Sequence, residues 1–485
     1  MPLIIGAKSA TATYTVDNSC RFNFGDSPKL TRAVSTGTAN TKFTLSCWFK
    51  TSTVNSSYGR ILWGGVDSGN ETGITLYATS AAQSGAINLY LYGSSSARSW
   101  VTNTSHRDPS AWYHMVVRVD TTDATAGDRI QLWVNGTRVT SWNTSSNPDE
   151  NETFDFFHSN NITIGREQDS GDRFSYDGYL AEVCAIDGTA YTASDFGEFS
   201  SDSPTIWVPK DPSGLTFGTS GFYLDFEDSA DLGADVSGNS NDFTEGSLDA
   251  TDQATDTPTN NFATFNPITR NPSDTGSLSQ GNCKYSLSSY AYNVKSTIGV
   301  SKGKWYFEVK TLVAENTRVG WCSSGFNNNL DTDDTSAFYP DAGGGVWITL
   351  SDNDTGWQIT NNDTSANTSQ FTNALAASDG SILMCAFDCD SGKIWFGVDG
   401  SWFNSGDPAA GSNETFTASN SSGDPYHVYG GYGSSGAMAS EWNFGGCASF
   451  TVSSGNADGD GYGNFEHAPP SGYYALCTKN LAEYG

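Results

Sequence analysis

Tyr113-His-Met-Val-Val-Arg-Val119 and Ile130-Gln-Leu-Trp-Val-Asn-Gly136 are the two stretches of sequence that decide the fold. In each, apolar side chains recur at every second position, which is the period of a strand that buries one face. The second stretch ends in Asn135-Gly136, a pair that readily adopts positive φ and closes tight hairpins. Both stretches therefore predict antiparallel β-strands.

Short alternating segments of this kind recur along the whole chain, separated by clusters of Gly, Asn, Asp and Ser. Helical periodicity over ten or more residues is hard to find. We therefore expect an all-β protein with two jelly-roll or β-sandwich domains. The further strand candidates are residues 43–49, 87–92, 161–165, 304–310, 345–350, 382–388 and 394–398.

The charge balance excludes several classes of partner. The 485 residues include 54 Asp and Glu against 24 Lys and Arg, a formal net charge of −30. Such a surface repels phosphate backbones and anionic lipid headgroups, so we expect no nucleic-acid partner. Because no apolar run approaches the roughly 18 residues that span a bilayer, we also expect no membrane insertion. The nine cysteines include no CxxC pair and are expected to be reduced, buried thiols.

An acidic stretch divides the chain. Residues 211–256 hold eleven acidic residues and no Lys or Arg, a pattern typical of an extended connector. Phe222-Tyr-Leu-Asp-Phe226 is too apolar for a plain linker, so we expect at least one strand there. The expected organisation is a first sandwich over residues 1–210, a connector over 211–275 and a second sandwich over 276–485.

Both sandwiches resemble known families. In order and spacing, Phe43-Thr-Leu-Ser-Cys-Trp-Phe49, Trp112-Tyr-His-Met-Val-Val117 and Asp177-Gly-Tyr-Leu-Ala-Glu-Val183 resemble strands of a laminin-G or pentraxin-type domain of the concanavalin A-like lectin superfamily. Gly303-Lys-Trp-Tyr-Phe-Glu-Val309 and Ser391-Gly-Lys-Ile-Trp-Phe-Gly-Val-Asp-Gly400 resemble strands of a SPRY domain. The first resemblance implies a two-sheet jelly roll, and the second a β-sandwich used for protein recognition.

A third resemblance covers nearly the whole chain. Together with Asp177–Val183, the blocks Leu232-Gly-Ala-Asp-Val-Ser-Gly-Asn-Ser-Asn-Asp242 and Asp256-Thr-Pro-Thr-Asn-Asn-Phe262 look like the linked blocks of modular virion proteins from marine bacteriophages. This resemblance implies a non-enzymatic tail-fibre, head-fibre or capsid-decoration component on the virion surface. Its implied partners are other virion proteins and a host surface glycan or protein receptor, with many copies or a homo-oligomer on each particle.

The start of the chain agrees with that location. The apolar patch in Met1–Lys8 is too short for a secretory signal, and its lysine follows the patch instead of preceding it. We therefore expect assembly in a host cytoplasm and later release to the outside.

Glu167-Gln-Asp169 is the sharpest candidate for metal binding. In pentraxins, which the first sandwich resembles, this tripeptide supplies oxygen ligands to Ca²⁺. Asp172 follows three residues later, and Asp67 lies in an earlier loop that can fold towards it. The expected Ca²⁺ site therefore comprises Glu167, Gln168, Asp169, Asp172 and Asp67. A plain acidic turn after a strand is the alternative.

Loop aromatic residues are the candidates for ligand binding. Trp100, Trp142, Tyr176 and Tyr179 lie in or beside expected loops, where a sandwich presents its binding sites. We expect their rings to stack on sugars.

Two alternative functions remain open. The first is a purely architectural role, in which the domains contact only other capsid or tail proteins. The second is a glycan-cleaving enzyme, because a related branch of the superfamily carries Glu-x-Asp-x-x-Glu as paired carboxylates on one strand. The nearest match, Glu167-Gln-Asp-Ser-Gly-Asp172, lacks the second Glu, so we do not expect an enzyme.

Overall fold

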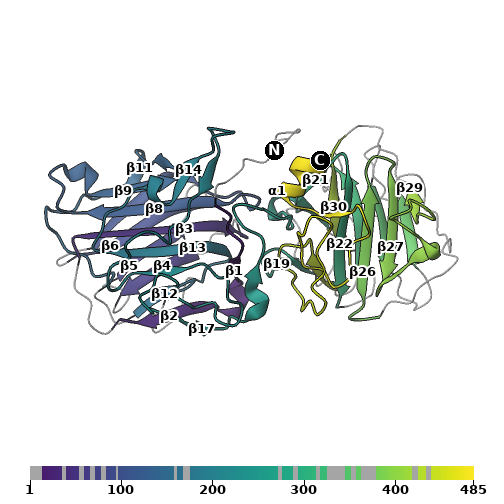
Figure 1. The fold of residues 1–485 in the computed structure, drawn as a ribbon, viewed down its shortest axis with the longest axis horizontal. Helices are drawn as coiled ribbons and strands as arrows, with labels where there is room; N and C mark the ends of the chain where they lie inside the picture. Colours follow the sequence, from purple (N-terminus) through teal and green to yellow (C-terminus); the bar gives the residue numbers. More distant parts are fainter. Residues whose placement is uncertain are drawn as a thin grey trace. The chain divides into compact units, whose positions relative to one another are not determined.

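A computed structural model gives the structure of the chain (Figure 1). Its described residues divide into two compact units, one that ends at Thr259 and one over Asn260–Gly485. The described residues are 14–34, 40–53, 59–65, 71–77, 84–93, 97–157, 161–167, 175–270, 276–287, 293–312, 317–324, 345–350, 357–361, 378–417, 424–432 and 438–485.

The first unit is a sandwich of two antiparallel sheets. One sheet has the order β10 (Thr137–Arg138), β9 (Ile130–Val134), β8 (Tyr113–Asp120), β3 (Lys42–Thr51), β13 (Gly178–Asp187), β1 (Ser19–Phe22) and β18 (Gln253–Ala254), with β16 (Phe222–Leu224) also paired to β13. The other has the order β11 (Trp142–Thr144), β7 (Ala97–Ser105), β6 (Ala86–Tyr92), β5 (Glu71–Tyr77), β4 (Gly59–Gly65), β12 (Asn161–Ile164), β2 (Lys29–Ala33) and β17 (Thr244–Gly246). A separate hairpin joins β14 (Gly197–Phe199) to β15 (Trp207–Pro209).

The second unit is also a two-sheet sandwich. Its larger sheet has the order β19 (Ser277–Ser279), β20 (Lys284–Leu287), β31 (Met438–Asn443), β22 (Lys304–Thr311), β26 (Ile382–Asp388), β27 (Lys393–Val398) and β28 (Ser401–Trp402). In addition, β29 (Phe416–Thr417) pairs with β27, and β32 (Tyr474–Ala475) pairs with β22. Its smaller sheet has the order β21 (Asn293–Val300), β30 (Tyr426–Tyr432), β23 (Thr317–Ser323), β24 (Gly345–Leu350) and β25 (Trp357–Asn361). A short helix, α1 (Thr478–Tyr484), closes the chain.

These sheets confirm the expected all-β class. Strands β8 and β9 pair antiparallel with Val117 opposite Leu132, and Asn135 and Gly136, both at positive φ, form the expected tight turn between β9 and β10. Nine free cysteines are present, and all but Cys389 are buried. No helix in the described part of the chain is long and apolar enough to cross a membrane.

The acidic stretch expected as a connector folds largely into the first unit. Its apolar segment forms β16, which pairs with β13 so that Leu224 lies opposite Val183. Further along the stretch, β17 pairs with β2 and β18 pairs with β1. The stretch folds because Phe222, Leu224 and Phe243 enter the hydrophobic core while its acidic residues occupy the turns between them. The unit boundary therefore falls at residues 259–260, inside the expected 211–275 connector.

Candidate functional site

The structure describes one of the five residues expected to bind Ca²⁺. Glu167 is buried, and its Oε2 accepts a hydrogen bond from Nη2 of the buried Arg60 at 2.6 Å. Residues 168–174 and 66–70, which include Gln168, Asp169, Asp172 and Asp67, lie outside the described residues. Among the residues that are described, no group of three or more His, Cys, Asp or Glu side chains is placed to hold a metal ion. The Ca²⁺ site therefore stays a prediction.

The expected aromatic platform needs a correction. Trp100, Tyr176 and Tyr179 are each at most 2% exposed, so no ring face is available to a sugar. Trp100 lies within β7 instead of a loop, and the Tyr176 hydroxyl donates to the Lys50 carbonyl at 3.0 Å. Only Trp142, which is partly buried in β11, retains exposed ring surface. Aromatic residues in strands with alternating faces can be buried, and the local sequence does not distinguish them from aromatic residues in exposed loops.

A buried Ser–His pair looks like a nucleophile with its base, but its hydrogen bonds exclude that role. His114 Nε2 lies 2.9 Å from Ser46 Oγ, and Trp207 Nε1 donates to His114 Nδ1 at 3.0 Å. An indole nitrogen can only donate, so Nδ1 is the acceptor and the ring proton of neutral His114 is on Nε2. Burial lowers the pKa of His114 to about 3, which keeps the ring neutral. His114 therefore donates to Ser46 and cannot take its proton.

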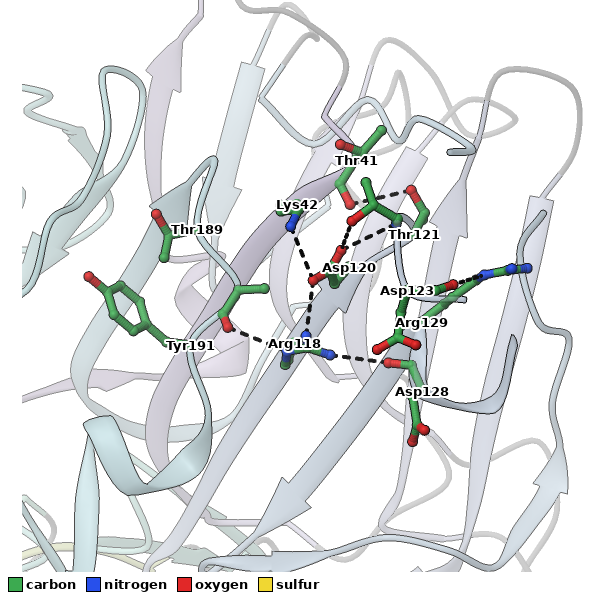
Figure 2. A network of polar contacts seen from close by, with 12 residues as sticks. Thr41, Lys42, Arg118, Asp120, Thr121, Asp123, Asp128, Arg129, Thr189 and Tyr191 are labelled. Carbon is green, nitrogen blue, oxygen red and sulfur yellow. Dashed lines mark hydrogen bonds and ion pairs between the residues drawn. The ribbon is translucent and has the colours of Figure 1, made fainter. Parts of the chain in front are cut away.

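The polar network around Arg118 is structural (Figure 2). Arg118 donates to the Asp120 carboxylate at 3.0 Å and to the carbonyls of Asp128 and Ala190 at 3.1 and 3.3 Å. Asp120 also accepts from the backbone and hydroxyl of Thr122. These groups are engaged with one another, so the network fastens the β8–β9 hairpin and offers little to a ligand.

A polar pocket of about 410 Å³ opens at one edge of the first sandwich, and we call it the rim pocket. It is lined by residues 31–34, 219–220, 240–242 and Thr244. The first group ends β2, Thr244 begins the neighbouring strand β17, and the other two groups belong to loops of the acidic stretch. The volume falls within the roughly 300–1,000 Å³ that small-molecule sites occupy.

Two asparagines lock the loops that form the wall of the rim pocket. Asn239 Nδ2 donates to the carbonyls of Gly218 and Gly221 at 2.7 and 3.0 Å. Asn241 Nδ2 donates to the carbonyls of Thr219 and Gly221 at 3.0 and 2.7 Å. The amides therefore satisfy main-chain acceptors across the two loops, and the wall is formed before any ligand arrives.

Two carboxylates fix the same wall from behind. Asp235 accepts from the backbone nitrogens of Tyr223 and Asn241 at 2.9 and 2.8 Å. Asp187, at the end of β13, accepts from the backbone nitrogen of Ser220 at 3.0 Å. Their oxygens are used by the scaffold, so these acids shape the rim pocket without being its contact groups.

Hydrogen-bonding groups that the scaffold does not use line the interior. Arg32 Nη1 donates to the Ser220 carbonyl at 2.9 Å, while its Nε and Nη2 have no partner within the described residues. Asp242 uses Oδ1 to accept from the Asp235 backbone at 3.0 Å, and Oδ2 has no partner in the same described set. Thr31 Oγ1 is buried without a hydrogen-bond partner in the described structure. The pocket thus offers ligands both donors and acceptors.

Burial and three nearby carboxylates act in opposite directions on the pKa of Arg32. Partial burial lowers the pKa of Arg32, and the carboxylates of Asp235, Asp187 and Asp242 act in the opposite direction. The guanidinium therefore stays protonated inside an acidic wall.

Sequence reasoning missed this pocket because its parts are about 190 residues apart in the chain. The local signal for these loops is the Asp/Asn/Ser/Gly-rich block at 232–242, a composition that is equally typical of a connector. Nothing in that block indicates that it packs beside β2.

Comparisons with known proteins define the class of each unit. Residues 24–195 match the laminin-G-type model of the concanavalin A-like lectin/glucanases superfamily, and residues 304–417 match the SPRY domain. The chain therefore carries a concanavalin A-like domain followed by a SPRY domain, in the order expected from the sequence. A comparison with curated proteins finds no match.

Several solved structures are similar to parts of the chain. A candidate carbohydrate-binding protein from Bacteroides ovatus is 14% identical, with 49% of this chain and 61% of that chain covered and a TM-score of 0.33. This chain thus spans less than two thirds of that protein. The SPRY domain of human HERC1 is 14% identical, with 39% and 99% covered and a TM-score of 0.24. The native heptameric SAP-like pentraxin of Limulus polyphemus is 18% identical, with 38% and 82% covered and a TM-score of 0.27.

Proposed function

We propose that this chain is a non-enzymatic recognition protein that binds a glycan in the rim pocket of its first domain. One observation carries the proposal: Arg32 and Asp242 present unused donors and an unused acceptor on a preformed wall. The match of the surrounding domain to a superfamily that includes lectins supports it.

Sugar hydroxyls suit this arrangement because each hydroxyl both donates and accepts hydrogen bonds. A guanidinium donates to the hydroxyl lone pairs, and a carboxylate accepts the hydroxyl protons. The hydroxyls of Thr219, Ser240 and Thr244 are exposed around the pocket and extend the same chemistry. Because the wall is rigid, binding orders few protein groups and costs little conformational entropy.

We also propose that the protein is displayed on the surface of a bacteriophage particle, as a fibre or decoration component. The resemblance of Asp177–Val183, Leu232–Asp242 and Asp256–Phe262 to virion blocks supports this location. One shallow polar site binds weakly. Many copies on a particle raise the avidity without new contacts, which fits attachment to a host surface.

A glycan array probed with the full chain tests the proposal, with Arg32→Ala as the key variant. Hydrogen bonds to a charged group contribute about 1.5–3 kcal/mol, so we expect affinity to fall roughly 10- to 150-fold. Arg138→Ala is the matched control, because Arg138 lies in the same domain and pairs with Asp128 on the surface.

Three results contradict the proposal. Equal binding by wild type and Arg32→Ala places the glycan elsewhere. If the protein binds no glycan but is present in purified virions, the architectural role is favoured. Release of reducing ends from a bound polysaccharide favours an enzyme.

A further inference from the structure

We infer that the rim pocket selects neutral saccharides and rejects glycans that carry carboxylate or sulfate groups; this inference rests on the proposed function. It follows from how the acids of the wall are placed around the single guanidinium.

The first acid, Asp187, is held next to Ser220, the residue to which Arg32 donates a hydrogen bond. The carbonyl of Ser220 accepts from Arg32 Nη1 at 2.9 Å, and the backbone nitrogen of the same residue donates to Asp187 Oδ2 at 3.0 Å. One residue therefore bridges the guanidinium and a carboxylate. Asp187 is anchored on its other side by Asn40, whose Nδ2 donates to Oδ1.

The other two acids belong to the facing loop. Asp242 Oδ1 accepts from the backbone nitrogen of Asp235 at 3.0 Å, and Asp235 Oδ2 accepts from the backbone nitrogen of Asn241 at 2.8 Å. Both carboxylates interact electrostatically with Arg32, as does Asp187. Three negative charges thus face one positive charge, and the pocket is net negative.

A net negative pocket discriminates by repulsion as well as by attraction. Each ligand carboxylate or sulfate approaches Asp242 in the lining and the carboxylates of Asp187 and Asp235 behind it, on a chain whose net charge is −30. At the separations and effective dielectric of a half-exposed site, one uncompensated like-charge pair weakens binding by about fivefold.

Hydrogen-bond polarity gives the same preference. Asp242 is exposed, and its Oδ2, which has no partner among the described residues, is open to a donor from the ligand. A hydroxyl group supplies that donor, whereas a carboxylate or sulfate has none. A carboxylate or sulfate group placed at Arg32 therefore cannot also donate to Asp242, and that contact then needs a hydroxyl elsewhere on the sugar.

Matched polysaccharides test the inference with the full chain. The probes are mannan against polymannuronate and galactan against polygalacturonate, each immobilised and measured for retention of the protein. We expect binding to a neutral member and at least about tenfold weaker binding to its acidic partner. Raising sodium chloride from about 0.05 to 0.5 M should change the neutral affinity by less than about twofold, because no ligand charge is involved.

Asp242→Asn sharpens the test. The asparagine oxygen can still accept from the Asp235 backbone, so the wall is retained while one negative charge is lost. We expect the preference for the neutral member to shrink by about fivefold. Asp202→Asn, which removes an exposed charge elsewhere in the same unit, should leave the preference unchanged.

The outcomes separate the two proposals. Tighter binding to the uronate members, dependent on Arg32, overturns the neutral preference and leaves glycan binding intact. An equal shift from Asp242→Asn and Asp202→Asn overturns it too, since the effect is then one of overall charge. Retention on none of the four polysaccharides, nor on any glycan of the array, overturns both.

Discussion

The buried carboxyl of Glu182 makes the stability of the first unit depend on pH, and one substitution should remove that dependence. Glu182 is 5% exposed and lies in a bulge of β13, where its φ of 51° is unusual for a residue other than glycine. Its Oε2 accepts from the hydroxyls of Tyr223 and Tyr14 at 2.8 and 3.2 Å. Within the described residues no cation pairs with this carboxyl group, so its negative charge is poorly compensated.

The size of the effect follows from the shift in pKa. Burial, together with repulsion from Asp225 and Asp211, raises the pKa of Glu182 from 4.5 to about 8. The folded state therefore holds the proton more tightly than the unfolded state. The stabilisation is complete below about pH 4.5 and is lost as the pH rises through 8. At 1.36 kcal/mol per pKa unit the total is about 5 kcal/mol, of which about 3.5 kcal/mol falls between pH 5 and pH 8.

Urea unfolding of the full chain at several pH values between 5 and 8 measures this loss, and hydrogen exchange of the β13 peptide assigns it to the first unit. Glu182→Gln keeps an oxygen acceptor for both tyrosines but cannot ionise. We expect the wild-type free energy of unfolding to fall by about 3.5 kcal/mol over the range, and the variant to lose that part of the slope. Asp202→Asn, an exposed control, should follow the wild type. Parallel profiles for wild type and Glu182→Gln would refute the reasoning.

Two further predictions concern the scaffold. Lys50 and Asp256 form an ion pair of 2.7 Å in which both side chains are 1% exposed, so Asp256→Ala should cost about 3–5 kcal/mol in urea unfolding. Adding Lys50→Met should recover much of that loss, and a cost below about 1 kcal/mol would contradict the buried pair. A Cβ on Gly221 would overlap the carbonyl oxygens of Phe217 and Ala185, so Gly221→Ala should destabilise the first unit by about 1–3 kcal/mol in thermal unfolding and weaken glycan binding. Unchanged melting and binding would show that the wall is less rigid than its hydrogen bonds indicate.

Local patterns in the sequence were sufficient for much of the fold. The alternation over 304–310, 382–388 and 394–398 corresponds to β22, β26 and β27, which are neighbours in one sheet. Strict period-two patterns identify strands because side chains alternate between the two faces of a sheet. The acidic stretch at 211–256 was harder, because β16, β17 and β18 are only two or three residues long. Segments this short are held in the sheets by their partners and carry little signal of their own.

The candidate site was beyond local patterns for a different reason. The rim pocket joins Arg32 to Asp242, and only the pairing of β2 with β17 brings them together. The prediction that the aromatic candidates are exposed was wrong because their burial also depends on distant parts of the chain. Trp100 follows Arg98-Ser99 and Tyr179 follows Asp177-Gly178, yet Trp100 belongs to the core between the sheets and Tyr179 is buried beside Lys50 and Trp112. Burial depends on which strands become neighbours, which no short window of sequence contains.

The hydrogen bonds between the loops at 218–221 and 239–241 also determine which positions of the rim pocket tolerate substitution. Asn239 and Asn241 hold main-chain carbonyls, which every residue type supplies. The contour of the wall is therefore independent of the side chains at Thr219, Ser220 and Ser240. Side chains at Thr219 and Ser220 can therefore change without loss of these hydrogen bonds, whereas the positive φ of 56° at Ser240 restricts the residues that fit there. The ligand preference of the rim pocket can therefore change through side chains at Thr219 and Ser220 while Asn239, Asn241 and the backbone that they bind stay the same.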